Sequence, residues 1–413
     1  MTLQTTDRPI RPASATEATA HVPAHWSGVF AMTLCVFALI ASEFMPVSLL
    51  TPLAADLQVS EGLAGYGIAI SAAFAVLTSL SIPALAGALD RKTLLLALTA
   101  LMCVSGLVIG AAPGYATYML GRALIGVVVG GFWSMSAAAA MRLVPPASVP
   151  RALAIFNGGN ALATIIAAPL GSYLGGIIGW RGAFYCLAPV ALAALMWQWV
   201  SLPPLRAHAS TAVRSKSSGN AFALLARPVV RLGMLAVGLF FMGQFVLFTY
   251  VRPFLESVTR VDLPTLSTML LALGGAGFVG TAVIGRFLQD GLYHTLTVIP
   301  LLMAAIALAL AGFGERAVVA GVLLALWGLM ATAAPVGWWS WLAQTLPDDA
   351  EAGGGLIVAV VQLSIALGST LGGALFDGSG YRATFAASAG ILVAAAALAG
   401  LTARAACRQT HPN

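Results

Sequence analysis

Residues 174–184 of the chain read LGGIIGWRGAF, and residues 371–385 read LGGALFDGSGYRATF. Both passages begin with Leu-Gly-Gly and continue to a Gly-aromatic-Arg triplet. They stand about half the chain apart, because Arg181 and Arg382 are separated by 382 − 181 = 201 of the 413 residues. Similarity at such a long period indicates a duplicated unit. The sequence therefore predicts a fold built from two related halves.

The composition is typical of a membrane protein. The chain is 60% hydrophobic and 8% charged, whereas a soluble domain carries roughly 25% charged residues. A hydrocarbon core about 30 Å thick needs about 20 apolar residues per helix, and such runs recur along the whole sequence. We expect twelve transmembrane helices, near residues 29–50, 66–85, 94–112, 117–140, 152–177, 182–202, 231–252, 265–288, 294–313, 317–343, 355–376 and 383–403.

The twelve predicted helices divide into two bundles of six. Because six is an even number, both bundles keep the same orientation, and a substrate site is expected between them near the middle of the membrane. We predict an all-α integral membrane protein with two six-helix bundles in parallel pseudo-repeat. The predicted parts are a cytoplasmic N-terminal tail (1–26), a first bundle (27–202), a cytoplasmic linker (203–227), a second bundle (228–403) and a cytoplasmic C-terminal tail (404–413).

The positive charges predict the orientation. Of the 20 Lys and Arg residues, one lies well inside a span, five lie in segments on the side opposite the N-terminus, and the remaining 14 lie on the N-terminal side. Cytoplasmic loops retain positive charge, so both termini are expected in the cytoplasm. The N-terminal tail has no apolar segment before Val29, and we expect the first helix itself, not a cleaved signal, to direct insertion.

Two charges are predicted at membrane depth: Glu43 is the one acid in the twelve spans, and Arg122 is the one arginine well inside a span. An intramembrane charge is costly and is a functional hypothesis by default. At 1.5 Å per residue, Glu43 lies about 21 Å above the cytoplasmic edge and Arg122 about 7.5 Å below the opposite edge, so the two are at nearly one depth. Direct or water-mediated pairing is feasible. A pair of this kind could couple proton binding at Glu43 to conformational change. Alternatively, the pair would only fix the orientation of the two helices.

Other energy sources are not indicated. Neither lysine, Lys92 or Lys216, follows a glycine as a phosphate-binding loop requires, and the five histidines lie in tails, connectors or span ends, which argues against a histidine relay. The four cysteines show no paired spacing that would indicate a disulfide or a metal site. We expect an ion gradient as the driving force, no metal and no cofactor.

Aromatic and amide side chains within the spans are candidates for a binding site, although each alone is more often a packing residue. Aromatic walls with a few hydrogen-bonding groups suit a flat, uncharged solute with polar edges. The candidates are Trp133, Asn157, Gln244, Tyr250, Trp338 and Gln362.

Small residues and prolines are candidates for conformational gating. Gly171 and Gly175 fall four apart, a spacing that lets helix backbones pack closely and would let this ridge slide against the second half. Pro169 predicts a kink. Asp90 and Arg91 form the charged loop after the second predicted span.

Several motifs resemble those of the major facilitator superfamily. Leu120-Gly121-Arg122, with Gly126 and Gly130, is similar to the family's span-four motif, and the passage from Ala168 to Arg181 resembles the fifth-span signature of its drug:proton antiporter branch. The passages 43–52, 131–136 and 335–338 resemble those of bacterial purine ribonucleoside efflux pumps. The loop after span two departs from the family pattern, since Asp90, Arg91 and Lys92 pass straight to Thr93 without the usual glycine and further basic residues.

The resemblance implies a transporter, not an enzyme, in a bacterial inner membrane. It implies export of purine ribonucleosides such as inosine and guanosine against proton uptake, with Glu43 and Arg122 at the proton site. A monomer in contact with membrane lipid, without a nucleic-acid partner, is expected.

Other functions stay open at this level. Proton-coupled efflux of drugs or sugars is the alternative within the superfamily. A channel would require a repeated pore segment, and a membrane enzyme a catalytic cluster beyond one glutamate and one arginine; neither pattern is seen in the sequence.

Overall fold

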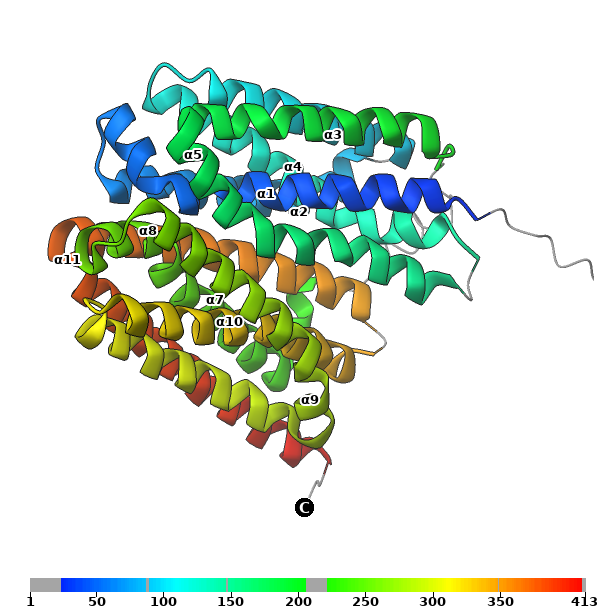
Figure 1. Ribbon diagram of the computed structural model, residues 1–413. Coiled ribbons are helices and arrows are strands. Elements are labelled where there is room, and N and C mark those ends of the chain that lie inside the picture. Colours follow the sequence, from blue (N-terminus) through cyan, green and yellow to red (C-terminus); the bar gives the residue numbers. More distant parts are fainter. Residues whose placement is uncertain (1–23, 87–88, 146–147, 206–220, 348, 411–413) are drawn as a thin grey trace, which may run out of the picture.

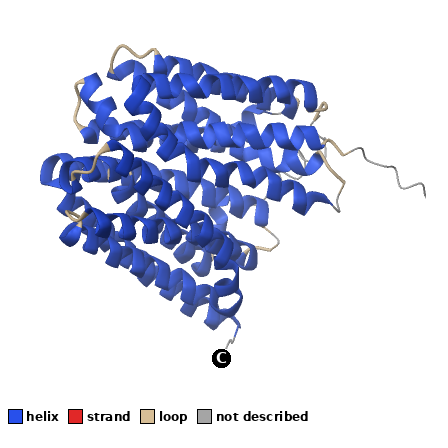
Figure 2. Cartoon of the chain, viewed as in Figure 1, coloured by secondary structure: helices blue, strands red, loops and turns tan. Residues whose placement is uncertain are grey.

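The computed structural model describes residues 24–86, 89–145, 148–205, 221–347 and 349–410. Within these ranges the regular structure is entirely helical (Figure 2). This agrees with the apolar composition, because inside a bilayer a helix satisfies all of its own backbone hydrogen bonds. The elements are α1 (Trp26–Leu57), α2 (Glu61–Ala86), α3 (Arg91–Gly110), α4 (Tyr115–Arg142), α5 (Val149–Ser201), η2 (Ala221–Ala226), α7 (Pro228–Phe248), α8 (Val251–Phe254), η3 (Leu255–Thr259), α9 (Leu263–Phe313), α10 (Ala317–Thr345) and α11 (Ala350–Thr410).

Three of these elements are hairpins of two helices. α5, α9 and α11 each contain one residue with non-helical backbone angles, at Gly179, Gly291 and Gly380 respectively. Ten stretches of the described residues are long and apolar enough to cross a membrane, and two of them, of 51 and 56 residues, are divided by Gly179 and Gly380. Because each of these two long stretches crosses the membrane twice, the ten stretches make twelve crossings. The predicted all-α membrane fold with twelve helices is therefore confirmed.

The repeat that predicted two halves has a structural counterpart. Gly179 has φ 75° and ψ 164°, and Gly380 has φ 78° and ψ 178°. This backbone region is open essentially only to glycine. Both halves therefore turn between their fifth and sixth crossings with the same strained geometry, immediately before the aromatic-Arg pair of the repeat.

The two halves have separate apolar cores and meet mainly at one end. One core is built from residues 29–205 and the other from residues 224–399. We call the end where α1 begins and α11 finishes the terminal end, and the end where α1 finishes and α11 turns at Gly380 the far end. Figure 1 shows the helices of the two halves converging at the far end and spreading apart toward the terminal end.

Some predicted boundaries differ from the structure. The seventh span was expected to run without a break through Arg252, but α7 ends at Phe248 and the chain continues as α8 and the π-helical turn η3. Pro253 lacks the N–H that would bond the Thr249 carbonyl, which favours a break here. α11 extends through most of the predicted C-terminal tail to Thr410, because residues 403–407, Ala-Arg-Ala-Ala-Cys, include strong helix formers. Most of the predicted N-terminal tail and linker lies outside the described residues.

Candidate functional site

Arg122 is fully buried and binds backbone carbonyls of two neighbouring helices. It donates from one terminal nitrogen to the Ser42 carbonyl at 2.9 Å, from the other to the Glu43 carbonyl at 3.0 Å, and from Nε to the Gly67 carbonyl at 2.9 Å. The Ser42 carbonyl is available because residue 46, four positions on, is a proline without an N–H. Arg122 therefore fastens α4 to α2 and to the part of α1 that precedes Pro46.

The Glu43 side chain lies beside this arginine without forming an ion pair with it. The ion pairs in the described part of the chain are Arg181–Asp56, Arg227–Asp349 and Arg252–Glu256. Glu43 and Arg122 are close together as predicted, and of the two forms of pairing left open, direct and water-mediated, the direct ion pair between the side chains is not formed here. Each of the three nitrogens of Arg122 donates to a backbone carbonyl oxygen, and only one of those oxygens belongs to Glu43.

The carboxylate of Glu43 instead faces the second half. Gln362 of α11 donates from Nε2 to Glu43 Oε1 over a long distance of 3.5 Å, and both residues are buried, with 7% and 5% of their surface exposed. The structure thus places one candidate for proton coupling against one candidate for substrate binding, across the interface between the halves.

An aromatic cluster adjoins this contact. Phe44, next to Glu43 in the chain, has its ring centre 5.9 Å from that of Phe245, which is 5.8 Å from that of Phe248. These rings come from both halves and pack with Val47 and Ile68. Phe44 and Phe245 were not predicted as site residues, although the position of Phe44 beside the one acid in the predicted spans was a usable signal.

Two further predicted substrate residues, Gln244 and Tyr250, belong to α7 and its break. The Oε1 atom of Gln244 is buried without a hydrogen-bond partner in the described residues, so it is a free acceptor in a low-polarity environment. Tyr250 is occupied: it donates to the Ser369 carbonyl at 2.8 Å, and its ring stacks on Phe376 at 5.3 Å. In this state Tyr250 holds two helices together.

The remaining three predicted substrate residues contact residues of their own half. Trp338 is 1% exposed in the core of the second half, with its ring edge-on to Trp341 at 5.9 Å, and its predicted binding role stays a prediction. Trp133 packs edge-on against Phe156 at 6.2 Å. Asn157 is exposed and donates to the Leu153 carbonyl of its own helix at 3.0 Å. Apolar residues surround these helices on every side, so sequence periodicity could not show which face meets the second half.

The predicted gating residues contact mainly their own half. Side chains added at Gly171 and Gly175 would meet Met45, Ser48 or Leu49 of α1, so the expectation that these two glycines face the second half is not met; their neighbour Gly176 faces Leu263 of α9. Their predicted gating role, like that of Pro169, stays a prediction.

Asp90 and Arg91 lie at the terminal end of the first half. The Asp90 side chain caps α3, accepting from the Lys92 N–H at 3.0 Å and from the Leu205 N–H at 2.8 Å, while the Arg91 N–H donates to the Leu205 carbonyl at 3.2 Å. These bonds join the loop after α2 to the segment after α5.

At the far end, a carboxylate that the sequence did not single out closes the interface. Asp377 of α11 accepts from the Gly62 N–H at 2.9 Å and from the Ser60 hydroxyl. It thereby caps the first turn of α2 in the other half, where free N–H groups and the helix dipole favour a negative charge.

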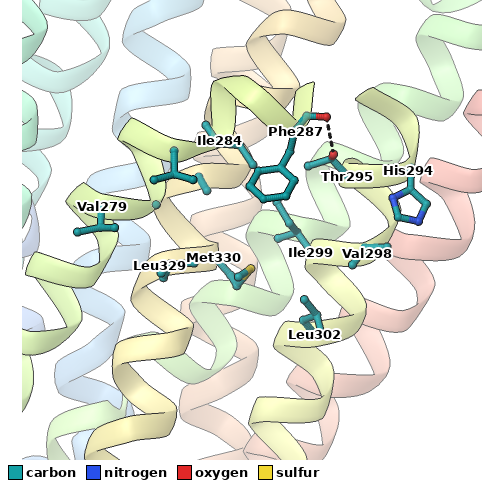
Figure 3. Close-up of a pocket in the computed structure, with 13 residues that line it drawn as sticks. Val279, Ile284, Phe287, His294, Thr295, Val298, Ile299, Leu302, Leu329 and Met330 are labelled. Carbon is teal, nitrogen blue, oxygen red and sulfur yellow. Dashed lines mark hydrogen bonds between the residues drawn. The ribbon is translucent and has the colours of Figure 1, made fainter. Parts of the chain in front are cut away.

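A separate pocket lies away from these residues. It has a volume of about 380 Å³ and lies between the two limbs of α9 and α10 (Figure 3). Its lining is apolar apart from His294 and Thr295, and Thr295 donates to the Phe287 carbonyl at 3.2 Å. Because none of the predicted site residues lines it, we place the candidate site at Glu43 and not here.

Comparison with known proteins supports a transporter. The sequence model of the Major Facilitator Superfamily matches residues 32–368. The transcription regulatory protein OpdE of Pseudomonas aeruginosa is 65% identical over 382 residues, covering 92% of this chain and 94% of that protein. The purine ribonucleoside efflux pump NepI of Salmonella typhimurium is 41% identical over 369 residues, covering 89% of this chain and 92% of that protein.

Solved structures share the fold. A bacterial homologue of the human lysosomal transporter Spinster, in an inward-facing and unoccupied conformation, matches with a TM-score of 0.77 at 17% identity, covering 93% of this chain and 98% of that one. A D-xylose-proton symporter matches with a TM-score of 0.70 at 16% identity, covering 91% and 96%. Twelve membrane crossings in two halves, a buried charge site between the halves and these similarities lead to one conclusion: the chain belongs to the Major Facilitator Superfamily of membrane transporters.

Proposed function

We propose that the protein is a proton-coupled efflux transporter that exports purine ribonucleosides by alternating access. The observation that carries this proposal is the buried Glu43 carboxylate at the interface, with Arg122 on one side and Gln362 of the other half on the other. The similarity to the purine ribonucleoside efflux pump NepI supports the substrate class.

Gln362 suits a partner of a carboxyl group that gains and loses a proton. Its amide nitrogen donates to the Glu43 carboxyl group in this structure and can do so while that group is ionised. Its amide oxygen can accept from the protonated acid, because an amide is both donor and acceptor. Arg122 keeps its charge throughout and favours the ionised form. Movement of the halves changes the Gln362 contact, so proton binding and conformation become linked.

The neighbouring groups suit a nucleoside. Phe44, Phe245 and Phe248 offer apolar rings on which a flat purine can stack. The free Oε1 acceptor of Gln244 can take a base N–H or a ribose hydroxyl. The uncharged sugar needs no cation, whereas a nucleotide phosphate would compete for Arg122, each of whose three nitrogens already donates to a backbone carbonyl. We therefore expect nucleosides and not nucleotides to be moved.

We assign the terminal end to the cytoplasm from the bias of positive charge toward that side. The convergence of the halves at the far end then corresponds to an inward-facing state (Figure 1). In the proposed cycle, a nucleoside binds from the cytoplasm and is released outside, a proton then binds Glu43, and the proton leaves into the cytoplasm after the return.

The test uses purified protein in proteoliposomes with an imposed pH gradient. Inosine, guanosine, their monophosphates, xylose and a cationic dye are offered in parallel. We expect proton-driven movement of the two nucleosides only, and its loss in Glu43→Gln, while exchange of nucleoside without a pH gradient persists. Asp56→Asn, a change of a half-exposed acid at the far end, is the matched control and should keep the coupling. Dye or sugar movement without nucleoside movement would instead support the alternative of drug or sugar efflux.

The relative named as a transcription regulatory protein favours a second candidate, a role in gene regulation. Most of the described residues lie in membrane-length helices, so we propose that such a role would act through the solute that is moved. Glu43→Gln should then remove both the transport and the regulatory effect in a reporter strain, whereas a direct regulator would keep the latter.

A further inference from the structure

α1 contains two carbonyl groups that its own helix cannot satisfy. Pro46 and Pro52 both lie inside the helix. Since proline has no N–H, each removes the hydrogen bond to the carbonyl four residues earlier. The affected carbonyls belong to Ser42 and Ser48, which are both buried. A buried backbone oxygen without a partner is costly, so each of these groups needs an external donor.

Each of the two carbonyls is met by a buried arginine. Arg122 of α4 donates to the Ser42 carbonyl at 2.9 Å. Arg252 of α8, 5% exposed, donates to the Ser48 carbonyl. The two contacts use the same chemistry but differ in origin: the first lies within the first half of the molecule, whereas the second joins the two halves at the far end.

Arg252 is held on its own half by a second contact. Its Nε and one terminal nitrogen each lie 2.8 Å from Oε1 of Glu256, one helical turn further on. Both residues of this pair belong to the second half, so separation of the halves does not by itself break it. The Ser48 carbonyl has no alternative donor within α1, because Pro52 lacks an N–H in every conformation.

We infer that Arg252 is a positioning residue of the transport cycle, whose hydrogen bond to the proline-freed Ser48 carbonyl holds the far end closed and breaks when that end opens. The inference rests on the proposed alternating access. In it, Pro52 frees the Ser48 carbonyl and Arg252 binds that carbonyl. If Arg252 only filled space at this position, the effect of replacing it would not depend on Pro52.

The dependence on Pro52 supplies the test. Replacing Pro52 by alanine restores an N–H that can bond the Ser48 carbonyl within α1. Arg252→Ala should raise the ratio of far-end-open to far-end-closed molecules by about 10- to 150-fold, the range expected for loss of one hydrogen bond made by a charged group. In a Pro52→Ala background the same substitution should change the ratio much less.

Pro46→Ala is the matched control. It repairs the same helix in the same way, but at the carbonyl that Arg122 serves from within the first half. It should leave the effect of Arg252→Ala unchanged.

The readout is the distance between spin labels on cysteines placed at Ala55 and Ser257, two exposed far-end positions on opposite halves. Cys103, Cys186 and Cys407 are replaced by serine, while Cys35 stays because it is fully buried. The distances are measured by pulsed electron paramagnetic resonance on the full-length protein in lipid nanodiscs without substrate.

An equal effect of Arg252→Ala with and without Pro52→Ala would overturn the inference, as would an unchanged distance distribution in Arg252→Ala. If Arg252→Ala does not fold, Arg252→Lys, which keeps the charge but loses the fork of donors, replaces it in the same cycle. Because no nucleoside is present, a failure of the proposed substrate appears only in the proteoliposome test and leaves this result intact.

Discussion

Arg122→Met is the most direct probe of the candidate site, because it removes the donors of Arg122 and keeps an apolar side chain of some length. Of the three carbonyls that Arg122 binds, those of Glu43 and Gly67 can still accept N–H groups of their own helices. The Ser42 carbonyl has no helical partner, because Pro46 occupies the fourth position after it. The substitution therefore leaves one buried carbonyl oxygen unsatisfied.

The magnitude follows from that single group. An unsatisfied buried acceptor costs about 1–3 kcal/mol, so we expect Arg122→Met to lower the free energy of unfolding by at least this amount. In combination with Pro46→Ala, which restores the missing N–H, most of the cost should disappear. The coupling energy of the double-mutant cycle should then be about 1–3 kcal/mol, well above the few tenths expected for independent sites. Arg122→Lys should recover part of the loss.

Stability is measured by reversible SDS titration of the four proteins of the cycle in mixed micelles. Arg227→Met serves as the control, because the Arg227 side chain is 57% exposed and lies 3.8 Å from the carboxylate of Asp349, and exposed ion pairs contribute about 0–1 kcal/mol. Additive effects of Arg122→Met and Pro46→Ala would refute the reasoning, since the guanidinium would then contribute nothing through the Ser42 carbonyl.

Three further predictions concern other parts of the molecule. Gln362→Met, which keeps the volume but neither donates nor accepts for Glu43, should shift the pH at which coupled transport is half-maximal, and an unchanged profile would remove Gln362 from the proton site. Gln244→Ala should weaken apparent nucleoside affinity about 5- to 150-fold, from the 1–3 kcal/mol of one buried hydrogen bond, as measured by competition in proteoliposomes. Gly380→Ala, at φ 78°, should destabilise the protein by about 1–3 kcal/mol, whereas Gly390→Ala, in open space within a helix, should be neutral or stabilising; equal melting temperatures would contradict the proposed strain.

The fold was predictable because the membrane leaves few alternatives. A run of about 20 apolar residues must form a helix there, and the repeat around Gly179 and Gly380 showed that the helices come in two sets. The prediction failed where a local feature interrupts a helix without changing its apolar character. The run through Arg252 reads as one span, although Pro253 favours a break one turn earlier.

The site was predictable in depth but not in its contacts. Helical rise alone brought Glu43 and Arg122 to one level, and the structure agrees. The atoms that Arg122 contacts in α1 are backbone carbonyl oxygens. A prediction based on charged side chains alone does not include these groups. Trp338 shows a second limit. A large aromatic side chain in a wholly apolar helix has no polar face opposite it, so nothing in the sequence predicted that Trp338 would pack in the core of one half rather than at the interface between the two.

The prolines of α1 suggest how one helix can carry both the proton site and the contact that closes the far end. Ser42–Pro46 and Ser48–Pro52 repeat the same four-residue spacing, so the free acceptors could be located from the sequence alone, and a buried arginine in another helix is the natural donor for each. Glu43 lies beside the acceptor that Arg122 serves from within its own half. When the far end opens, Glu43 therefore keeps Arg122 as a neighbour, while Arg252 and Gln362 belong to the half that moves. It follows that the change in proton affinity during the cycle has to come from the loss of Gln362 and the entry of water or solute, with Arg122 as a constant positive charge. Removal of Arg122 should then shift proton binding equally in both states, whereas removal of Gln362 should shift it in the far-end-closed state alone.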